Sequence, residues 1–492
     1  MVAASVYLAI VAVVLTVAYL KTLYRRRRSS EPPIPKGHFI WGNGADFSKH
    51  AVKYLHKTQK KLGDIFTIRL LHQHLTVIMD PHSYESFVKE TSFDFDPIQK
   101  QVNHNVFSFA LIDAKKMLKE AAKKVRGSHL HKGMEQYSKH LNATHIGVTS
   151  TEGFGPSTEW RTDGLRQFNS KTLFVSMFYT IFGKGKSTDV FEPLTVYKNF
   201  DLFHKYFNYL WLGMPVNMFP KALKALSVLC QQPESAELLS REDVSEYIRF
   251  STQFMLENGQ SEQDIIGHNL VYLHVNYNTF RMAFWSVLYL MQHKEALHAL
   301  REEIQDVVDT KLSNGEVNED GEVVLTLEDV DSMVLLDSNT KETLRMCSGV
   351  FMVRAITADT SFEMSNGQKY DLREGDKVAM YPPTIHQDPE IFENPESYKH
   401  DRFVDAKFYK YGKEIRNPIL SFGSLCPGKK YAITQGKWFL LSLVYKFDFE
   451  LCDGETTELD VKYYGHEILP PTNDVQIRYR MRENTHTLAF SS

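Results

Sequence analysis

The stretch that decides the fold is Ser421-Phe422-Gly423-Ser424-Leu425-Cys426-Pro427-Gly428-Lys429-Lys430-Tyr431-Ala432. An apolar run with helical spacing follows it, so Cys426 stands directly ahead of a predicted helix. Unpaired backbone N–H groups and the positive end of the helix dipole favour an anion at that position. We therefore expect the thiol pKa of Cys426 to be lowered, which makes a thiolate available for a soft metal.

The residues around Cys426 suit a flat bound group. Pro427 fits the first turn of a helix, where no N–H is needed, and glycines at 423 and 428 let the backbone come close to such a group. The cysteines are too scattered for a zinc or iron–sulfur cluster: Cys230, Cys347, Cys426 and Cys452. One metal-ligating cysteine favours a single axial bond to haem iron. The alternative is a buried structural cysteine, the commoner fate of a lone Cys.

A second group of residues lies upstream. Glu342 and Arg345 are three positions apart in a predicted helix, so they share a face and can pair. Such a pair is weak evidence alone, because exposed pairs with this spacing are common and contribute only about 0.3–0.5 kcal/mol. Arg402, in the segment 398–403, is expected to join them in a partly buried network that fixes the loop behind the cysteine.

Composition limits the possible functions. The chain has 492 residues and 57 Lys and Arg against 60 Asp and Glu, a net charge of −3, which disfavours a nucleic-acid partner held by bulk positive charge. Four cysteines cannot form a dense disulfide framework. A run of basic side chains between Lys115 and Lys132 is either a solvated helical face or a docking patch for an acidic partner protein.

The N-terminal segment predicts a membrane anchor. Residues 1–20 carry no charged side chain, and a segment of this length can form a helix that spans a bilayer. Four arginines, Arg25 to Arg28, follow it. Arginines behind the span favour an uncleaved anchor with the bulk of the chain in the cytosol, over a cleaved signal peptide. Three prolines in 29–37 predict a stiff linker. On this topology the sequon Asn142-Ala143-Thr144 is an ordinary surface tripeptide.

The globular part is predicted to be mostly α-helical with small β-sheets. Segments 64–70 and 74–79 are β-branched and predict a strand pair. Asn366-Gly367, between two short strands, predicts a tight hairpin. Helical spacing covers 114–124, 166–182, 242–257 and one very long stretch from about 264 to 306.

These features together resemble a known family. The order Glu342-x-x-Arg345, then Asp401-Arg402-Phe403, then Phe422-Gly423 leading to Cys426-Pro427-Gly428 resembles the cytochrome P450 haem-thiolate proteins, over the whole chain. Shorter matches resemble the subgroup that contains sterol and bile-acid 7α- and 12α-hydroxylases and prostacyclin synthase. They lie at 31–33, 63–67, 80–84, 388–391, 408–413 and 474–480.

The resemblance implies a cytochrome P450 fold behind one N-terminal transmembrane helix, divided into an anchor (1–24), a basic and Pro-rich hinge (25–37) and a haem domain (38–492). Cys426 resembles the axial thiolate of haem b, and Arg354 the arginine that pairs with a haem propionate. Glu342, Arg345 and Arg402 resemble the family's structural triad. Asn278 and Thr279 resemble the distal stretch, where Thr279 would help to deliver protons; the alternative is that both only bend or cap the helix locally.

By the same resemblance the chain is a monooxygenase that hydroxylates a lipophilic substrate, with sterols or bile-acid precursors as the class. It would sit in the endoplasmic reticulum membrane, facing the cytosol, and take electrons from NADPH-cytochrome P450 reductase. One alternative is an endoperoxide isomerase like prostacyclin synthase. Another is a non-catalytic haem- or lipid-binding relic, because the loop before Cys426 is about three residues shorter than the family's, and Tyr277 and Arg281 replace a small residue and a proline.

Overall fold

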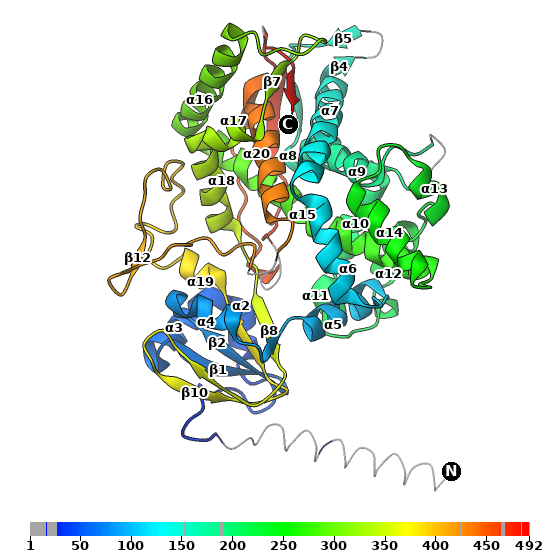
Figure 1. Cartoon of the computed structure of the whole chain (residues 1–492). Helices are drawn as coiled ribbons and strands as arrows, with labels where there is room; N and C mark the ends of the chain where they lie inside the picture. Colours follow the sequence, from blue (N-terminus) through cyan, green and yellow to red (C-terminus); the bar gives the residue numbers. More distant parts are fainter. Residues whose placement is uncertain are drawn as a thin grey trace.

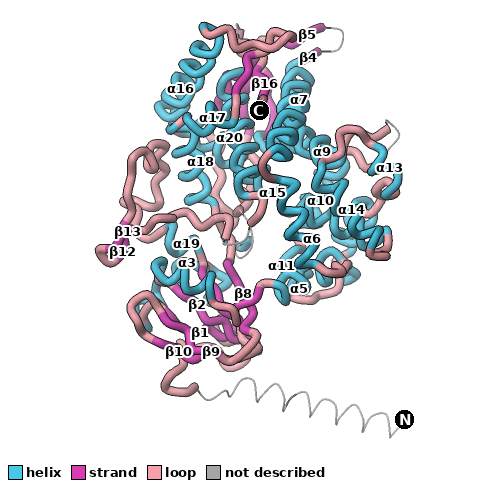
Figure 2. The backbone as a smooth tube through the Cα atoms, in the orientation of Figure 1, coloured by secondary structure: helices cyan, strands magenta, loops and turns pink. Residues whose placement is uncertain are grey.

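The computed structural model describes residues 27–151, 154–186, 190–423, 426–463, 468–483 and 485–491, together with Thr16. Helices fill most of the molecule, and a smaller region rich in strands lies at the N-terminal side (Figures 1 and 2). This confirms the predicted mostly helical class with small sheets. Most of the buried apolar side chains form one core among the helices, and two smaller cores lie on the faces of the N-terminal sheet.

The largest sheet has five strands, in the order β1-β2-β11-β8-β3. The predicted strand pair forms as β1 (Ile65–Leu70) and β2 (Gln73–Ile78), which are antiparallel. β11 (Lys377–Met380) pairs with β2 in parallel and with β8 (Met352–Ile356) antiparallel, and β3 (Phe93–Asp94) pairs with the other edge of β8. Segments from both halves of the chain therefore build one sheet.

The hairpin predicted at Asn366-Gly367 is confirmed. β9 (Thr360–Glu363) and β10 (Lys369–Leu372) pair antiparallel on either side of it. Gly367 has a φ of 83°, in the left-handed region that the tight turn requires and that glycine adopts without strain.

The central helix α15 (Glu262–Gln292) is buried on nearly its whole circumference, as expected of a helix in the middle of a large domain. A capping box between Ser261 and Asp264 starts it. The prediction of one continuous helix from 264 to 306 is wrong. α15 ends before His293, and a second helix, α16 (Lys294–Ser313), follows it. α16 buries apolar side chains at helical spacing: Ala296, Leu300, Ile304 and Val308. The apolar spacing therefore continues through the break between the two helices.

The remaining predicted helices form with shifted limits. Segment 114–124 becomes α6 (Ala114–Ala121) and a 3-10 turn at Ala122–Val125, and segment 242–257 becomes α14 (Glu246–Glu257). Segment 166–182 becomes α8 (Leu165–Asn169), a π-helical turn at Ser170–Phe174 and α9 (Val175–Phe182). The helices that position the site are α18 (Val334–Cys347) and α20 (Lys429–Lys446), which pack beside α15 (Figure 1).

The hinge is held along the sheet region. The backbone carbonyl of Pro33 accepts from the Thr67 N–H at 2.9 Å, and Glu31, which is buried, pairs with Arg373. Residues 1–24 lie outside the described residues apart from Thr16, so the anchor stays a prediction. Among the residues that the structure describes, no helix combines the length and apolar character needed to cross a bilayer.

Candidate functional site

Cys426 lies just ahead of α20, whose N-cap is Gly428. Cys426 is exposed, while the described residues before it end at Gly423. The expected lowering of its thiol pKa is wrong for the protein alone. Protein packed around the thiol raises the pKa of Cys426, and this effect exceeds the lowering by the backbone N–H of Gly428 and by the charges of Lys429 and Arg126. A bound metal cation would favour the thiolate against this effect.

Two hydrogen bonds hold residues on either side of Cys426. Arg126 Nε donates to the Pro427 carbonyl at 3.2 Å, and Ser421 Oγ donates to the Leu344 carbonyl, near the end of α18, at 3.2 Å. Gly423 has a φ of 59°, and a Cβ there would lie 3.7 Å from the Met352 side chain in β8. The cysteine segment thus rests against α18, β8 and the turn before α7 (Ser128–Thr149).

The structure brings Glu342, Arg345 and Arg402 together. Arg345 Nε donates to Glu342 at 2.7 Å and Arg402 Nε donates to it at 2.9 Å. The Glu342 side chain has no exposed area, so the network is buried more completely than the partial burial that the sequence suggested. Both guanidinium groups also donate to backbone carbonyls of the segment 386–397, which fixes that segment behind α18.

α15 and α20 touch where Met282 meets Gly436. The end of the Met282 side chain lies where a Cβ at Gly436 would stand, and the Thr279 methyl lies 3.9 Å from the same point. Seven residues earlier on the same face of α15, Val275 is 50% exposed, although the residues on either side of it, His274 and Asn276, are buried. The face of α15 that meets α20 at Met282 is therefore uncovered two turns earlier, at Val275.

This arrangement fits the expected haem. It offers a thiol at the open end of α20, half-buried Ala432 and Ile433 in the first turns of that helix, and an uncovered stretch of α15 at Val275 and Asn278. Apolar walls and one cysteine are the surroundings that a macrocycle with an axial thiolate needs. Thr279 is buried on the α20 side of α15.

Asn278 makes two hydrogen bonds. Its Oδ1 accepts from the Ile468 N–H at 3.1 Å, and its Nδ2 donates to the Val275 carbonyl at 3.3 Å. The loop 468–472 is therefore tied to α15, and Trp285 Nε1 adds a bond to the Leu469 carbonyl at 2.7 Å. Pro470 and Pro471 are buried, whereas Thr472 at the end of this loop is exposed.

Tyr277 is fully buried and turned away from Thr279, because residues two apart in a helix lie about 200° apart around its axis. Its hydroxyl donates to Asp201 Oδ1 at 2.9 Å, on α10 (Pro193–His204), and Asp201 also pairs with Arg166. Although Tyr277 stands where the family has a small residue, its ring fills the contact between α15 and α10.

Arg281 also faces α10. Its Nη2 donates to His204 Nδ1 at 3.1 Å, and His204 Nε2 lies 3.1 Å from His274 Nδ1. Because arginine only donates, His204 carries its proton on Nε2 and donates it to His274. The sequence analysis predicted neither histidine. His274 could have been found, because it shares a helical face with Tyr277 and Arg281. His204 lies on a separate helix, and nothing in the sequence connects it with them.

Arg354 lies in β8 and is buried. Its guanidinium packs over the rings of Phe95 at 5.0 Å and Phe87 at 5.7 Å, and its Nη1 donates to the Val353 carbonyl at 2.8 Å. Burial lowers the pKa of Arg354, and the charge of Asp94 opposes that. The structure places this arginine in the strand that the cysteine segment touches.

The basic run lies beside the cysteine. Arg126 contacts Pro427, and Lys124, His129 and Lys132 line a small cavity of about 20 Å³ together with Tyr431. Lys115 and Lys119 are exposed on α6. The basic patch therefore lies near Cys426 and extends over more than one helix.

Comparisons with known proteins agree with this geometry. The family model described as Cytochrome P450 matches residues 32–132 and 278–476. The chain is 30% identical to 7-alpha-hydroxycholest-4-en-3-one 12-alpha-hydroxylase of Oryctolagus cuniculus, over 94% of this chain and 96% of the relative. It is 31% identical to 5-beta-cholestane-3-alpha,7-alpha-diol 12-alpha-hydroxylase of Sus scrofa (94% and 95%) and 31% to prostacyclin synthase of Rattus norvegicus (93% and 95%). The chain belongs to the cytochrome P450 family, whose cofactor is haem b on an axial cysteine thiolate.

Proposed function

We propose that this chain is a haem-thiolate monooxygenase that hydroxylates a lipophilic molecule of the sterol or bile-acid precursor class. The observation that carries this is the 50% exposure of Val275, which lies on the face of α15 that meets α20 at Met282 and Gly436. When bound, haem supplies the oxygen chemistry. Two of the similar proteins are named as sterol 12α-hydroxylases, which supports the substrate class.

The residues take distinct roles in this proposal. Cys426 would hold the haem iron through its thiolate, and Arg354 would pair with a haem propionate. Glu342, with Arg345 and Arg402, holds the segment behind the ligand by buried ion pairs. Thr279 holds or passes a proton on the α20 side of α15, and Asn278 positions the loop 468–472 beside it.

The test is optical. Purified full-length protein, reduced under carbon monoxide, should show a difference spectrum with the Soret band of a thiolate-ligated haem. Cys426→Ser should abolish that band, whereas Cys452→Ser, at a half-buried cysteine in another part of the chain, should leave it unchanged. A band that survives Cys426→Ser would assign the ligand elsewhere, and a protein that takes up no haem would support a non-catalytic relic.

The second candidate is endoperoxide isomerisation, favoured by the 31% identity to rat prostacyclin synthase. An isomerase needs no electron donor. Reconstituted enzyme should therefore be assayed for sterol hydroxylation with and without NADPH and reductase, and for endoperoxide turnover without either. Hydroxylation only with both supports the monooxygenase, whereas endoperoxide turnover without a donor supports the isomerase.

The domain limits and membrane topology extend the proposal. An anchor at 1–24 and a hinge at 25–37 would hold the haem domain, 38–492, on the cytosolic face of the endoplasmic reticulum. Exposed Phe39, Ile40 and Trp41 directly behind the hinge support contact with a lipid surface. Expressed in eukaryotic cells, the full chain should resist alkaline extraction from microsomes and remain open to added protease; full protection from protease would reverse the topology.

A further inference from the structure

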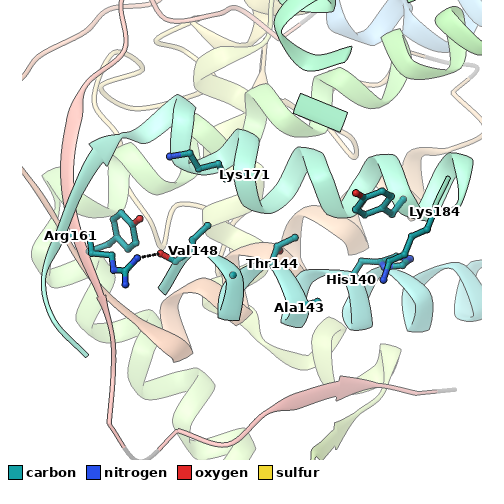
Figure 3. A pocket seen from close by; sticks show the side chains of 10 residues that line it. His140, Ala143, Thr144, Val148, Arg161, Lys171 and Lys184 are labelled. Atoms are coloured by element: carbon teal, nitrogen blue, oxygen red, sulfur yellow. Dashed lines mark hydrogen bonds between the residues drawn. The ribbon is translucent and has the colours of Figure 1, made fainter. Parts of the chain in front are cut away.

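The surface groove on α7 that Figure 3 shows has charged walls that are already paired. It encloses about 540 Å³, and Arg161, Lys171 and Gly147 are among the residues that line it. Arg161 Nη1 donates to the Val148 carbonyl at 3.0 Å, and Lys171 pairs with Asp163 at 2.5 Å. A Cβ at Gly147 would meet nothing within 4 Å. These two cations therefore hold the walls of the groove together rather than await a ligand.

A cluster of tyrosines lies where α14 meets the two helices of the haem site. Tyr247 of α14, Tyr272 of α15 and Tyr431 of α20 line one small cavity. Tyr272 is buried, and the other two are half-buried. The rings of Tyr247 and Tyr272 are stacked, with 3.8 Å between their centres and 9° between their planes. Phenols are among the side chains that are most easily oxidised, and two rings in this contact can exchange an electron directly.

The tyrosine cluster reaches towards the haem site along both helices. Tyr272 lies seven residues before Thr279 on the same face of α15, which is about 10 Å along the helix axis. Tyr431 lies five residues after Cys426, in the first turn of α20. An oxidising equivalent at the haem site therefore has a phenol ring on either helix through which it can move away.

His268 provides a proton acceptor for this cluster. Its Nε2 lies 3.5 Å from the Tyr247 hydroxyl, and the planes of the two rings differ by 9°. His268 is 3% exposed, and its Nδ1 makes no hydrogen bond within the described part of the chain. Burial lowers the pKa of His268 to about 4 and raises the pKa of Tyr247, so at pH 7 the imidazole is neutral and the phenol keeps its proton. A neutral Nε2 can accept that proton once the phenol is oxidised.

We propose that Tyr247, Tyr272 and His268 form a relay that discharges an oxidised haem site to a reductant at the surface. Tyr247 loses one electron, which passes through Tyr272 to the haem site. Its O–H bond breaks as the proton moves to His268 Nε2, which leaves a neutral tyrosyl radical beside an imidazolium. A reductant then returns an electron to half-buried Tyr247, and His268 returns the proton.

The oxidant in this scheme is an organic hydroperoxide, and the reductant is ascorbate. The O–O bond breaks with uptake of two electrons and two protons, and an alcohol and water form. Two ascorbate anions supply both, one electron and one proton each, and the relay carries the electrons one at a time. This activity rests on the haem of the family, goes beyond the proposed monooxygenase function and does not depend on the substrate class.

The test is electron paramagnetic resonance. Full-length haem-loaded protein should be mixed with cumene hydroperoxide without substrate and frozen, and the wild type should show a tyrosyl radical. Tyr247→Phe, which keeps the ring stack but has no O–H, should lose this signal. His268→Gln, whose side chain cannot take up a proton, should lose it too. Both variants should also lose haem absorbance faster than the wild type, and ascorbate should protect the wild type alone.

Tyr289→Phe is the matched control and should keep the radical. Tyr289 also belongs to a tyrosine stack, with Tyr398 at 4.9 Å between ring centres, but it lies near the other end of α15. Before hydroperoxide is added, the carbon-monoxide difference spectrum should be the same in all three variants, so a lost radical is told apart from a lost haem site. A radical that survives Tyr247→Phe, a radical that Tyr289→Phe removes, or no radical in a wild type with an intact spectrum would overturn the relay.

Discussion

At the scale of single residues, buried charges position the segment 386–402 behind α18. The Glu342 carboxylate is enclosed with two guanidinium groups, and each of these also donates to backbone carbonyls. A buried ion pair of this kind adds little net stability compared with apolar packing, yet removal of one partner leaves a charge without compensation. The network therefore specifies where the segment 386–402 lies more than it strengthens the fold.

Glu342→Gln should lower the free energy of unfolding by about 3–5 kcal/mol, because Arg345 and Arg402 would stay buried without a carboxylate. Urea unfolding followed by circular dichroism measures this. Glu85→Gln, which removes an exposed partner of Lys89, should change it by less than about 1 kcal/mol. Equal effects of the two substitutions would contradict the role given to Glu342.

His386 makes stability depend on pH. Burial, with the charge of Arg345, lowers the pKa of His386 to about 3, and the Leu420 N–H donates to its Nε2 at 3.2 Å. An unfolded histidine takes up a proton near pH 6.5. The stability that neutral His386 provides is thus fully present above about pH 6.5 and is lost as the pH falls towards 3, by up to about 1.4 kcal/mol per pH unit.

His386→Gln should therefore show a shallower loss of unfolding free energy than the wild type between pH 7 and pH 5 in urea titrations. His298→Gln, at an exposed histidine, is the control and should keep the wild-type slope. Because Leu420 is six residues before Cys426, haem retention should follow the same pH trend. Parallel slopes for wild type and His386→Gln would refute this.

At the scale of elements, two long helices differ in how closely they are packed. α15 is surrounded along most of its length, whereas α7 leaves part of one face open beside Gly147. A Cβ at Gly267 in α15 would lie 2.8 Å from the Phe107 carbonyl oxygen, which is backbone and cannot swing aside. Two glycines within helices thus have opposite surroundings.

The same substitution should have opposite effects at these two positions. Gly267→Ala should lower the free energy of unfolding by about 1–3 kcal/mol through overpacking, despite the better helix propensity of alanine. Gly147→Ala should raise it by up to about 1 kcal/mol, since only the propensity changes. Thermal unfolding midpoints measure both, and a loss at Gly147 would show that its environment is not open.

At the scale of the whole molecule, segments far apart in sequence meet at one surface. The turn that carries Arg126 contacts Pro427, about 300 residues later, so exposed lysines of α6 share a side of the molecule with the cysteine segment. Local positive charge steers an acidic partner even though the net charge is −3.

Lys115→Gln combined with Lys119→Gln should slow NADPH-driven reduction of the haem by reductase about tenfold at low salt, and the difference should shrink near 1 M salt, where the screening length is about 3 Å. Stopped-flow reduction under carbon monoxide measures the rate. Lys221→Gln with Lys224→Gln, exposed on α12 (Pro220–Leu229), is the matched control. Equal slowing in both double variants would exclude a specific docking role.

The sequence by itself determined the helical class, the first strand pair, the Asn366-Gly367 hairpin, the pairing of Glu342 with Arg345 and the family. These depend on residues close in the chain or on one recognisable order of short motifs, so local spacing carries the information. The sequence did not determine where the helices end. Apolar spacing runs through the break at His293, so the pattern alone does not separate α15 from α16.

Only the tertiary structure decided which way Tyr277 turns, what raises the pKa of Cys426, where Arg126 reaches and how Arg281, His204 and His274 connect. Each of these involves partners on elements that are distant in the chain. A side chain's direction, its desolvation and its hydrogen-bond partner all depend on what the folded chain places next to it, and a pattern along one segment does not contain that neighbour.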